Sequence, residues 1–387
     1  MRLLPTILPP ALGAVLLAGS VLPAGAVALP GRDTDLIEPR APRGEEAAPS
    51  PEFLPVVRAF GDWTVTCDNL RSCTAIGYPS AEGSFPAPSL AIRRDAGPDA
   101  AAEAWITVTG EPEDWALRFD VARFDPALAD LAYTETDSGV RYDIPADRLG
   151  DFIAGATASG VLTLDAGEGS RPRTISLVGA TASLRFIDDV QGRADTVTAF
   201  VARGDAPAAS VPPAPSLPLI AAPSVSVTAL FGRPAAVTEA WRADCSGQGV
   251  EEVPEGAGYR LTGDDGATTD LWVVLCQGGA YNFGYRVYDT TGGGAEPVLF
   301  ERPVDAGLAP LDPLAWNIGI DDLGGPAAPF VLREFDKGRG LGDCGMRAEH
   351  VWTGSGFSLT FFASEEHCAG RVLDDWPALW RAQVAPE

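Results

Sequence analysis

Histidine and lysine are nearly absent from this 387-residue chain. It has two histidines, and Lys337 is the only lysine among 28 basic residues. With so few imidazoles, and without closely spaced cysteine pairs of the C-x2-4-C kind, the sequence offers no recognisable zinc site. The G-x-S-x-G elbow, the Walker loop and the H-E-x-x-H motif are also missing. The common signatures of hydrolases, nucleotide-binding proteins and zinc proteases are therefore excluded, and we expect no metal, no cofactor and no assignable catalytic residue.

Positive charge is scarce as well. The formal net charge is −25 at pH 7, with an isoelectric point near 4.4. Nucleic acids and anionic lipid surfaces attract proteins through basic patches, so this balance argues against both partners. Long apolar runs are confined to the N-terminus, and no later segment has the length to cross a bilayer.

The N-terminal residues 1–28 read as a secretory signal peptide. Arg2 supplies the early positive charge, an apolar stretch follows, and Ala26-Val27-Ala28 forms a small-x-small cleavage site. Several prolines interrupt the apolar stretch, which disfavours the alternative of an uncleaved membrane anchor. We therefore expect a periplasmic or secreted bacterial protein without stable membrane insertion after cleavage.

Composition divides the rest of the chain. Residues 29–54 are rich in proline and charge and lack an apolar period, which predicts a disordered lead-in. Residues 204–224 are rich in proline, alanine and serine and predict an extended linker. Two domains are expected on either side of this linker, at 55–203 and 225–387.

We expect a mainly β fold with some helix, of the α+β class, built from two disulfide-stapled antiparallel domains. The first domain opens with short β-rich segments and changes in its second half, where apolar spacings of three and four predict two or three helices. The first two are centred on Phe152 and Ile187, and 195–204 is a candidate continuation of the second. The second domain is mostly strand, with a hairpin around Gly278-Gly279 and a short helix at 374–383.

Six cysteines fall on either side of the linker: Cys67, Cys73, Cys245, Cys276, Cys344 and Cys368. An even number in an exported chain indicates disulfides, and sequence alone allows 15 pairings. If each domain folds separately, Cys67 pairs with Cys73, and the remaining four cysteines pair locally. For those four we select Cys245 with Cys276 and Cys344 with Cys368. A redox couple or a Cys/His zinc site near Cys368 fits the spacing less well.

Tryptophan precedes three of these cysteines by four positions, at Trp63, Trp241 and Trp272. On a strand, residues four apart share one face, so each indole is expected to pack beside its disulfide in the core.

Two groups of residues are candidates for function. The aromatic residues Tyr281, Phe283 and Tyr285 alternate along one strand and are a possible recognition surface, although core packing explains the same pattern. His350 is a possible general base with Asp343 or Glu349, although a partly exposed structural histidine is the favoured explanation.

The chain resembles a known bacterial family of exported proteins with six cysteines, catalogued as domain of unknown function 1176. The segments FGDWTVTCDNLRSC, WRADCSG, LWVVLCQGGAYN, RGLGDCG, HVWTGSGFSL and WPALWRA carry the resemblance. The front half, with FGDWTVTC and ISLVGATASLRFID, is also similar to the invasion-associated locus B family, which implies a β-rich exported domain. Neither resemblance implies a catalytic residue.

These observations together predict a non-catalytic binding or interaction protein of the cell envelope, whose partner is an unidentified envelope component or protein. The alternative is an envelope hydrolase that uses His350 and nearby carboxylates.

Overall fold

The computed structural model describes residues 55–79, 88–109, 116–119, 123–124, 130–136, 139–165, 171–304, 307–320 and 328–385. The predicted signal peptide and lead-in lie outside these ranges. The described residues belong to one compact unit, and the division into two domains stays a prediction. We refer to the described residues of 55–203 as the first half and to those of 225–385 as the second half.

A seven-stranded antiparallel sheet organises the first half, in the order β1-β2-β3-β4-β5-β9-β8. Its strands are β1 Val56–Phe60, β2 Trp63–Cys67, β3 Cys73–Gly77, β4 Pro88–Arg94, β5 Ala102–Thr109, β8 Tyr133–Thr136 and β9 Gly139–Asp143. Alternate side chains point to opposite faces. Leu90 and Ile92 on β4 are therefore buried in the core, while the next residue, Arg93, is directed to the opposite face.

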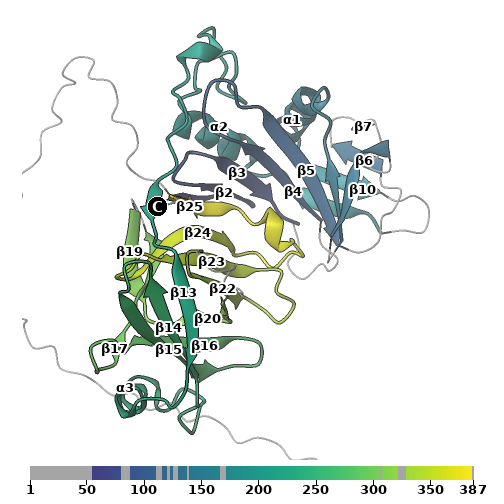
Figure 1. Ribbon diagram of the computed structural model, residues 1–387. Coiled ribbons are helices and arrows are strands. Elements are labelled where there is room, and N and C mark those ends of the chain that lie inside the picture. Colours follow the sequence, from purple (N-terminus) through teal and green to yellow (C-terminus); the bar gives the residue numbers. More distant parts are fainter. Residues whose placement is uncertain are drawn as a thin grey trace, which may run out of the picture. The chain divides into compact units, whose positions relative to one another are not determined.

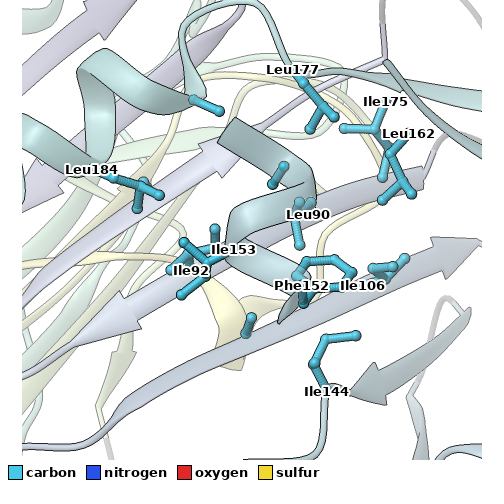
Figure 2. Close-up of a cluster of buried hydrophobic side chains, with 14 of the residues drawn as sticks. Leu90, Ile92, Ile106, Ile144, Phe152, Ile153, Leu162, Ile175, Leu177 and Leu184 are labelled. Atoms are coloured by element: carbon cyan, nitrogen blue, oxygen red, sulfur yellow. The ribbon is translucent and has the colours of Figure 1, made fainter. Parts of the chain in front are cut away.

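Two helices cover one face of this sheet, as Figure 1 shows. They are α1 Leu149–Ala158 and α2 Ala180–Val190. A four-stranded sheet packs beside them in the order β11-β10-β6-β7, formed by Arg173–Ser176, Val161–Asp165, Ala116–Phe119 and Arg123–Phe124. Phe152, Ile153 and Leu184 fill the space between helices and sheet, facing Leu90 and Ile92 (Figure 2).

The second half contains two larger sheets and a hairpin. One sheet has the order β13-β14-β15-β16-β17, with β20 paired to β16. Its strands are β13 Val225–Leu230, β14 Ala257–Gly263, β15 Thr268–Gly278, β16 Phe283–Asp289, β17 Glu296–Pro297 and β20 Ala315–Trp316, and the hairpin is β18 Phe300–Val304 with β19 Gly307–Asp312. The other sheet has the order β21-β22-β23-β24-β25. Its strands are β21 Gly319–Ile320, β22 Val331–Lys337, β23 Gly345–Trp352, β24 Phe357–Glu365 and β25 Ala378–Arg381.

The fold class expected from the sequence, mainly β with some helix, is confirmed. Both α1 and α2 form where the apolar spacing predicts them. The candidate continuation of the second helix is wrong, because 195–203 form turns. There the backbone N–H groups of Phe200, Val201 and Ala202 donate to the buried Asp188 carboxylate, which replaces helical hydrogen bonding.

The predicted C-terminal helix is wrong. Leu373–Asp375 form a single 3-10 turn, η3, and β25 and β26 Gln383–Ala385 follow. Phe361 and Phe362 of β24 pair with Arg381 and Trp380, so sheet pairing overrides the local helix signals. β26 pairs in parallel with β12 Leu219–Ala221, and Ala208–Ser210 form a 3-10 turn, η2. Part of the predicted linker therefore has regular structure.

The three disulfides are Cys67–Cys73, Cys245–Cys276 and Cys344–Cys368, the pairs selected from the sequence. Trp63 and Trp272 share a strand with their cysteines, as expected. Trp241 does not, because it lies with Cys245 on helix α3 Ala235–Cys245. A spacing of four also repeats on one helical face, so Trp241 and Cys245 are still buried together.

The aromatic hairpin differs in its turn. Gly278 pairs directly with Phe283, which leaves four residues in the loop rather than the expected two. Gly279 donates its N–H to the Asn282 carbonyl, and a bulge lies at Leu275 and Gln277. None of the helices in the described ranges has the length and apolar content needed to cross a bilayer.

Candidate functional site

A cleft of about 250 Å³ lies between the first sheet and residues 345–381, which we call the C-terminal segment. Its floor comes from the sheet face that α1 and α2 do not cover. Thr74, Arg93 and Glu103 are directly opposite one another on β3, β4 and β5, so their side chains stand in one row on that face. The wall comes from β23, β24, η3 and β25. We call this site the inter-half cleft.

The C-terminal segment is held against the first sheet by buried polar contacts. The Tyr78 hydroxyl donates to Glu365 at 2.7 Å, and Arg371 Nε lies 3.1 Å from the same carboxylate. Arg371 also donates to Ser89 Oγ at 3.0 Å and to the Asp375 carbonyl at 2.7 Å. Both charged side chains are almost fully enclosed. Burial raises the pKa of Glu365, and Arg371 opposes that rise. One wall of the cleft is therefore fixed to its floor.

Two ion pairs are built into the deeper part of the cleft. Arg381 Nη2 lies 2.6 Å from Asp68 Oδ2, and Arg141 Nη1 lies 2.7 Å from Asp375 Oδ1. Burial raises the pKa of Asp68, against the opposing effect of Arg381. Burial would lower the pKa of Arg141, but Asp375 and Asp143 outweigh it and raise that pKa. These four charges neutralise one another across the two halves.

The remaining charges in the cleft are open. Arg347 Nη1 lies 3.3 Å from Asp374, whose side chain is 94% exposed, and the Arg347 Nε is enclosed without a hydrogen-bond partner. Glu103 is exposed and makes no ion pair with another described residue. Within the described part of the chain, Arg93 pairs only with Asp95, which is itself half exposed.

Aromatic rings orient two of the arginines. The Arg141 guanidinium lies 4.1 Å from the centre of the Trp105 ring, and that of Arg347 lies 4.9 Å from the Phe361 ring. Such stacking holds a guanidinium in place and leaves its edge available for hydrogen bonding. The cleft thus combines fixed cations, open carboxylates and aromatic surface, which is a composition suited to binding a small polar molecule.

His350 is not in the cleft. Its side chain on β23 has 0% exposure, whereas the sequence suggested a partly exposed histidine. The carboxylate next to this histidine is that of Glu334, 3.2 Å from Nδ1. The two partners expected from the sequence, Asp343 and Glu349, pair with other residues. Asp343 pairs with Arg339, and Glu349 with Arg333. A general base must reach its substrate, and this imidazole is enclosed.

Burial and charge set the protonation of this pair. Burial, together with the Arg302 cation, lowers the pKa of His350 to about 3. Burial raises the pKa of Glu334 to about 7, although Arg302 Nη2 donates to it at 2.8 Å. At neutral pH the imidazole is therefore uncharged. The other histidine, His367, stacks on the Tyr78 ring with centres 4.0 Å apart.

The three aromatic residues of the predicted recognition surface differ in exposure. Tyr281 and Phe283 are 39% and 42% exposed, and Tyr281 lies against the loop of Gly338 and Gly340. Tyr285 is half-buried and packs against the core of the second half, where it lines an apolar groove. Only the first two residues thus form an exposed surface.

Asp343, Cys344 and Cys368 cluster closely enough to suggest a metal site. The two sulfurs are joined in a disulfide, so neither is a thiolate that could bind zinc. The Asp343 carboxylate accepts bonds from Arg339 and from the Gly370 N–H. We interpret this cluster as structural.

Sequence reasoning missed every charged residue of the cleft. Arg93 and Glu103 lie on neighbouring strands of the first sheet, whereas Arg347 and Asp374 come from the second half, and only tertiary packing brings the two groups together. The alternation along β4 and β5 does place Arg93 and Glu103 on the non-core face, and that was the available signal.

One comparison with known proteins shows the family. The model of the family described as protein of unknown function, DUF1176, matches residues 57–383. An uncharacterized protein of Escherichia coli K12, YpfG, is 29% identical over 348 residues, covering 84% of this chain and 93% of its own length. The crystal structure of invasion associated protein B from Bartonella henselae aligns at 17% identity with a TM-score of 0.27, covering 35% of this chain and 99% of its own.

Proposed function

The chain belongs to the DUF1176 family, and on that premise we propose that it is an exported, non-catalytic binding protein of the bacterial cell envelope whose ligand site is the inter-half cleft. The observation that carries the proposal is the cleft itself, where stacked arginines and open carboxylates from both halves line one cavity. Export is supported by the three disulfides, since such bonds persist in oxidising compartments.

A non-catalytic role is supported by the state of the charged groups. The deeper carboxylates, Asp68 and Asp375, are each held by an arginine and so act as structural anions. His350, the general base of the hydrolase alternative, is enclosed beside Glu334. The cleft has charged and aromatic side chains that can orient a ligand. Its deeper ion pairs join the two halves.

A cleft-filling variant tests the proposal. Ala378 on β25 lines the cleft, so Ala378→Trp is expected to occupy its space. The oxidised protein is heated with fractions of a low-molecular-mass extract of bacterial envelopes, and the unfolding midpoint is measured. A ligand that binds only the folded protein raises this midpoint. At least one fraction should raise it for the wild type and for Ala229→Trp, a control at an exposed position on β13, but not for Ala378→Trp. No shift with any fraction, or equal shifts in all three proteins, would refute the site.

The exposed hairpin is a second candidate, as a surface for contact with another protein. Tyr281 and Phe283 are exposed, and so is Leu341 in the adjacent loop, at 68%. In a deletion strain, the double variant Tyr281→Ser, Phe283→Ser should fold normally but fail to restore function. Full complementation by this variant would remove the hairpin from consideration.

A further inference from the structure

We propose that the inter-half cleft binds a small zwitterion, a free amino acid or short peptide that carries one carboxylate and one protonated amine. This inference rests on the proposed function and specifies the ligand class of the same site. It is argued from the charges that the cleft leaves open, from the orientation of one arginine and from the size of the cavity.

The cleft is balanced in charge although the chain is strongly acidic. Its lining holds four arginines and four carboxylates, whereas the whole chain carries a formal charge of −25. Two pairs, Arg381 with Asp68 and Arg141 with Asp375, are internal. An anionic ligand would meet the open carboxylates, and a cationic ligand would meet the guanidinium groups of Arg93 and Arg347, which these pairs do not use. A ligand with both charges meets an opposite charge at each end.

Arg347 is the group placed to receive the carboxylate. Its guanidinium is stacked on Phe361, and its only ion-pair partner among the described residues is the 94% exposed Asp374, 3.3 Å from Nη1. The Nη2 atom has no hydrogen-bond partner among the described residues, whereas Nε is enclosed and is not accessible to a ligand. A guanidinium nitrogen without a partner can donate a charge-assisted hydrogen bond to a ligand carboxylate.

Glu103 is the group placed to receive the ammonium. It stands on the floor of the same cleft, on the strand next to Arg93, and has no ion-pair partner among the described residues. Arg93 is directed instead to Asp95, at 3.0 Å. The Glu103 carboxylate is thus free to pair with a cation at the opposite end of a ligand from Arg347.

The size of the cavity favours a small molecule. Its volume of about 250 Å³ lies below the roughly 300 Å³ at which pockets for drug-sized ligands begin. Trp105 and Trp376 add aromatic surface to the lining, which suits a ligand with a short apolar side chain.

Matched ligands test the assignment. The dipeptide alanyl-alanine is compared by isothermal titration calorimetry with its N-acetyl form, which lacks the ammonium, and with its C-terminal amide, which lacks the carboxylate. Because a charge-assisted bond is lost in each case, both capped forms should bind at least about tenfold more weakly than the dipeptide. Ala378→Trp should abolish binding of all three.

Two variants link each ligand group to its residue. Arg347→Gln should weaken binding of the dipeptide at least about tenfold and leave binding of the amide unchanged, because the amide has already lost that contact. Glu103→Gln should weaken the dipeptide and spare the N-acetyl form for the same reason. Arg260→Gln, at an exposed ion pair outside the cleft, is the control and should change nothing. Circular dichroism and the unfolding midpoint establish that each variant is folded.

The outcomes separate this inference from the proposed function. If the N-acetyl form binds as tightly as the dipeptide, the cleft is an anion site, and if the amide does, it is a cation site; either result overturns the zwitterion. If the dipeptide does not bind while an envelope fraction still stabilises the wild type but not Ala378→Trp, the ligand class is wrong and the cleft remains the site. Binding of the dipeptide to Ala378→Trp would place it elsewhere and also overturn the inference.

Discussion

The indole of Trp63 lies directly over Gly77 on the neighbouring strand. The two residues are register partners on β2 and β3, and a Cβ added to Gly77 would lie 2.5 Å from Trp63 Cε2. Trp272 faces Gly258 in the same way, and Trp316 faces Gly284. Each glycine provides the space in which a large ring lies flat on the sheet.

Gly77→Ala should therefore destabilise the protein. Overpacking of a core site typically costs about 1–3 kcal/mol, and this Trp63 is held by a bond from Nε1 to the Ser176 carbonyl at 2.8 Å. Chemical denaturation measures the change. Gly150→Ala is the matched control, because nothing lies within 4 Å of its added methyl group on helix α1. That control should be neutral or slightly stabilising, and an equal loss in both variants would contradict the packing argument.

The buried contact between the halves should be intolerant of single changes. Arg371→Met removes the cation beside Glu365 and leaves a buried carboxylate without its charge partner, which typically costs about 3–5 kcal/mol. The double variant Arg371→Met, Glu365→Gln removes both charges and should recover part of that loss. Urea unfolding of the wild type and the variants measures it. A double variant that is less stable than Arg371→Met would show that the two charges do not act as a pair.

Glu334 should make stability depend on pH. Burial raises its pKa in the folded protein from 4.5 to about 7. Its contribution is therefore fully present below pH 4.5 and is lost as the pH rises toward 7. The free energy of unfolding of the wild type minus that of Glu334→Gln should decrease over this interval. Urea unfolding at several pH values measures this difference. His350 titrates in both proteins, so its effect on stability largely cancels in the difference. A difference that does not change with pH would contradict the raised pKa.

The two longer disulfides should contribute more stability than the short one. On the loop-entropy model, the separations of 31 and 6 residues correspond to about 3.7 and about 2.2 kcal/mol. The double variant Cys245→Ala, Cys276→Ala should thus lower the free energy of unfolding more than Cys67→Ala, Cys73→Ala. Guanidinium unfolding of oxidised protein compares them, and the reverse order would count against the entropic explanation.

The sequence predicts the elements whose signals are local and leaves open those that depend on distant partners. Helices α1 and α2 follow from apolar spacings of three and four, and the cysteine pairs follow from their grouping along the chain. The spacing of Trp241 and Cys245 fits a strand and a helix equally, and Val237, four residues earlier, fits both as well, so this pattern could not identify the helix. The C-terminal residues carry helix-start signals, yet β25 forms because β24 offers an open edge for pairing.

The inter-half cleft could not be predicted for a related reason. Arg347 and Glu103 come from strands of different sheets, and each looks like an ordinary exposed charge in its own segment. Only the packing of the C-terminal segment on the first sheet brings them to one cavity. Arg371, which fixes that packing, is fully enclosed, although arginine is rarely buried and its sequence context gives no sign of it.

The pairing of Asn69 with Arg381 constrains the order in which the chain can fold. Asn69 exchanges two hydrogen bonds with the Arg381 backbone across 312 positions, and Arg381 also pairs with Asp68. The first half therefore cannot complete its contacts during synthesis until Arg381 has emerged. Until then the uncovered face of its sheet is open to solvent and to other chains, and contacts this distant in sequence form slowly. A chain that stops before β25 would keep that face open permanently.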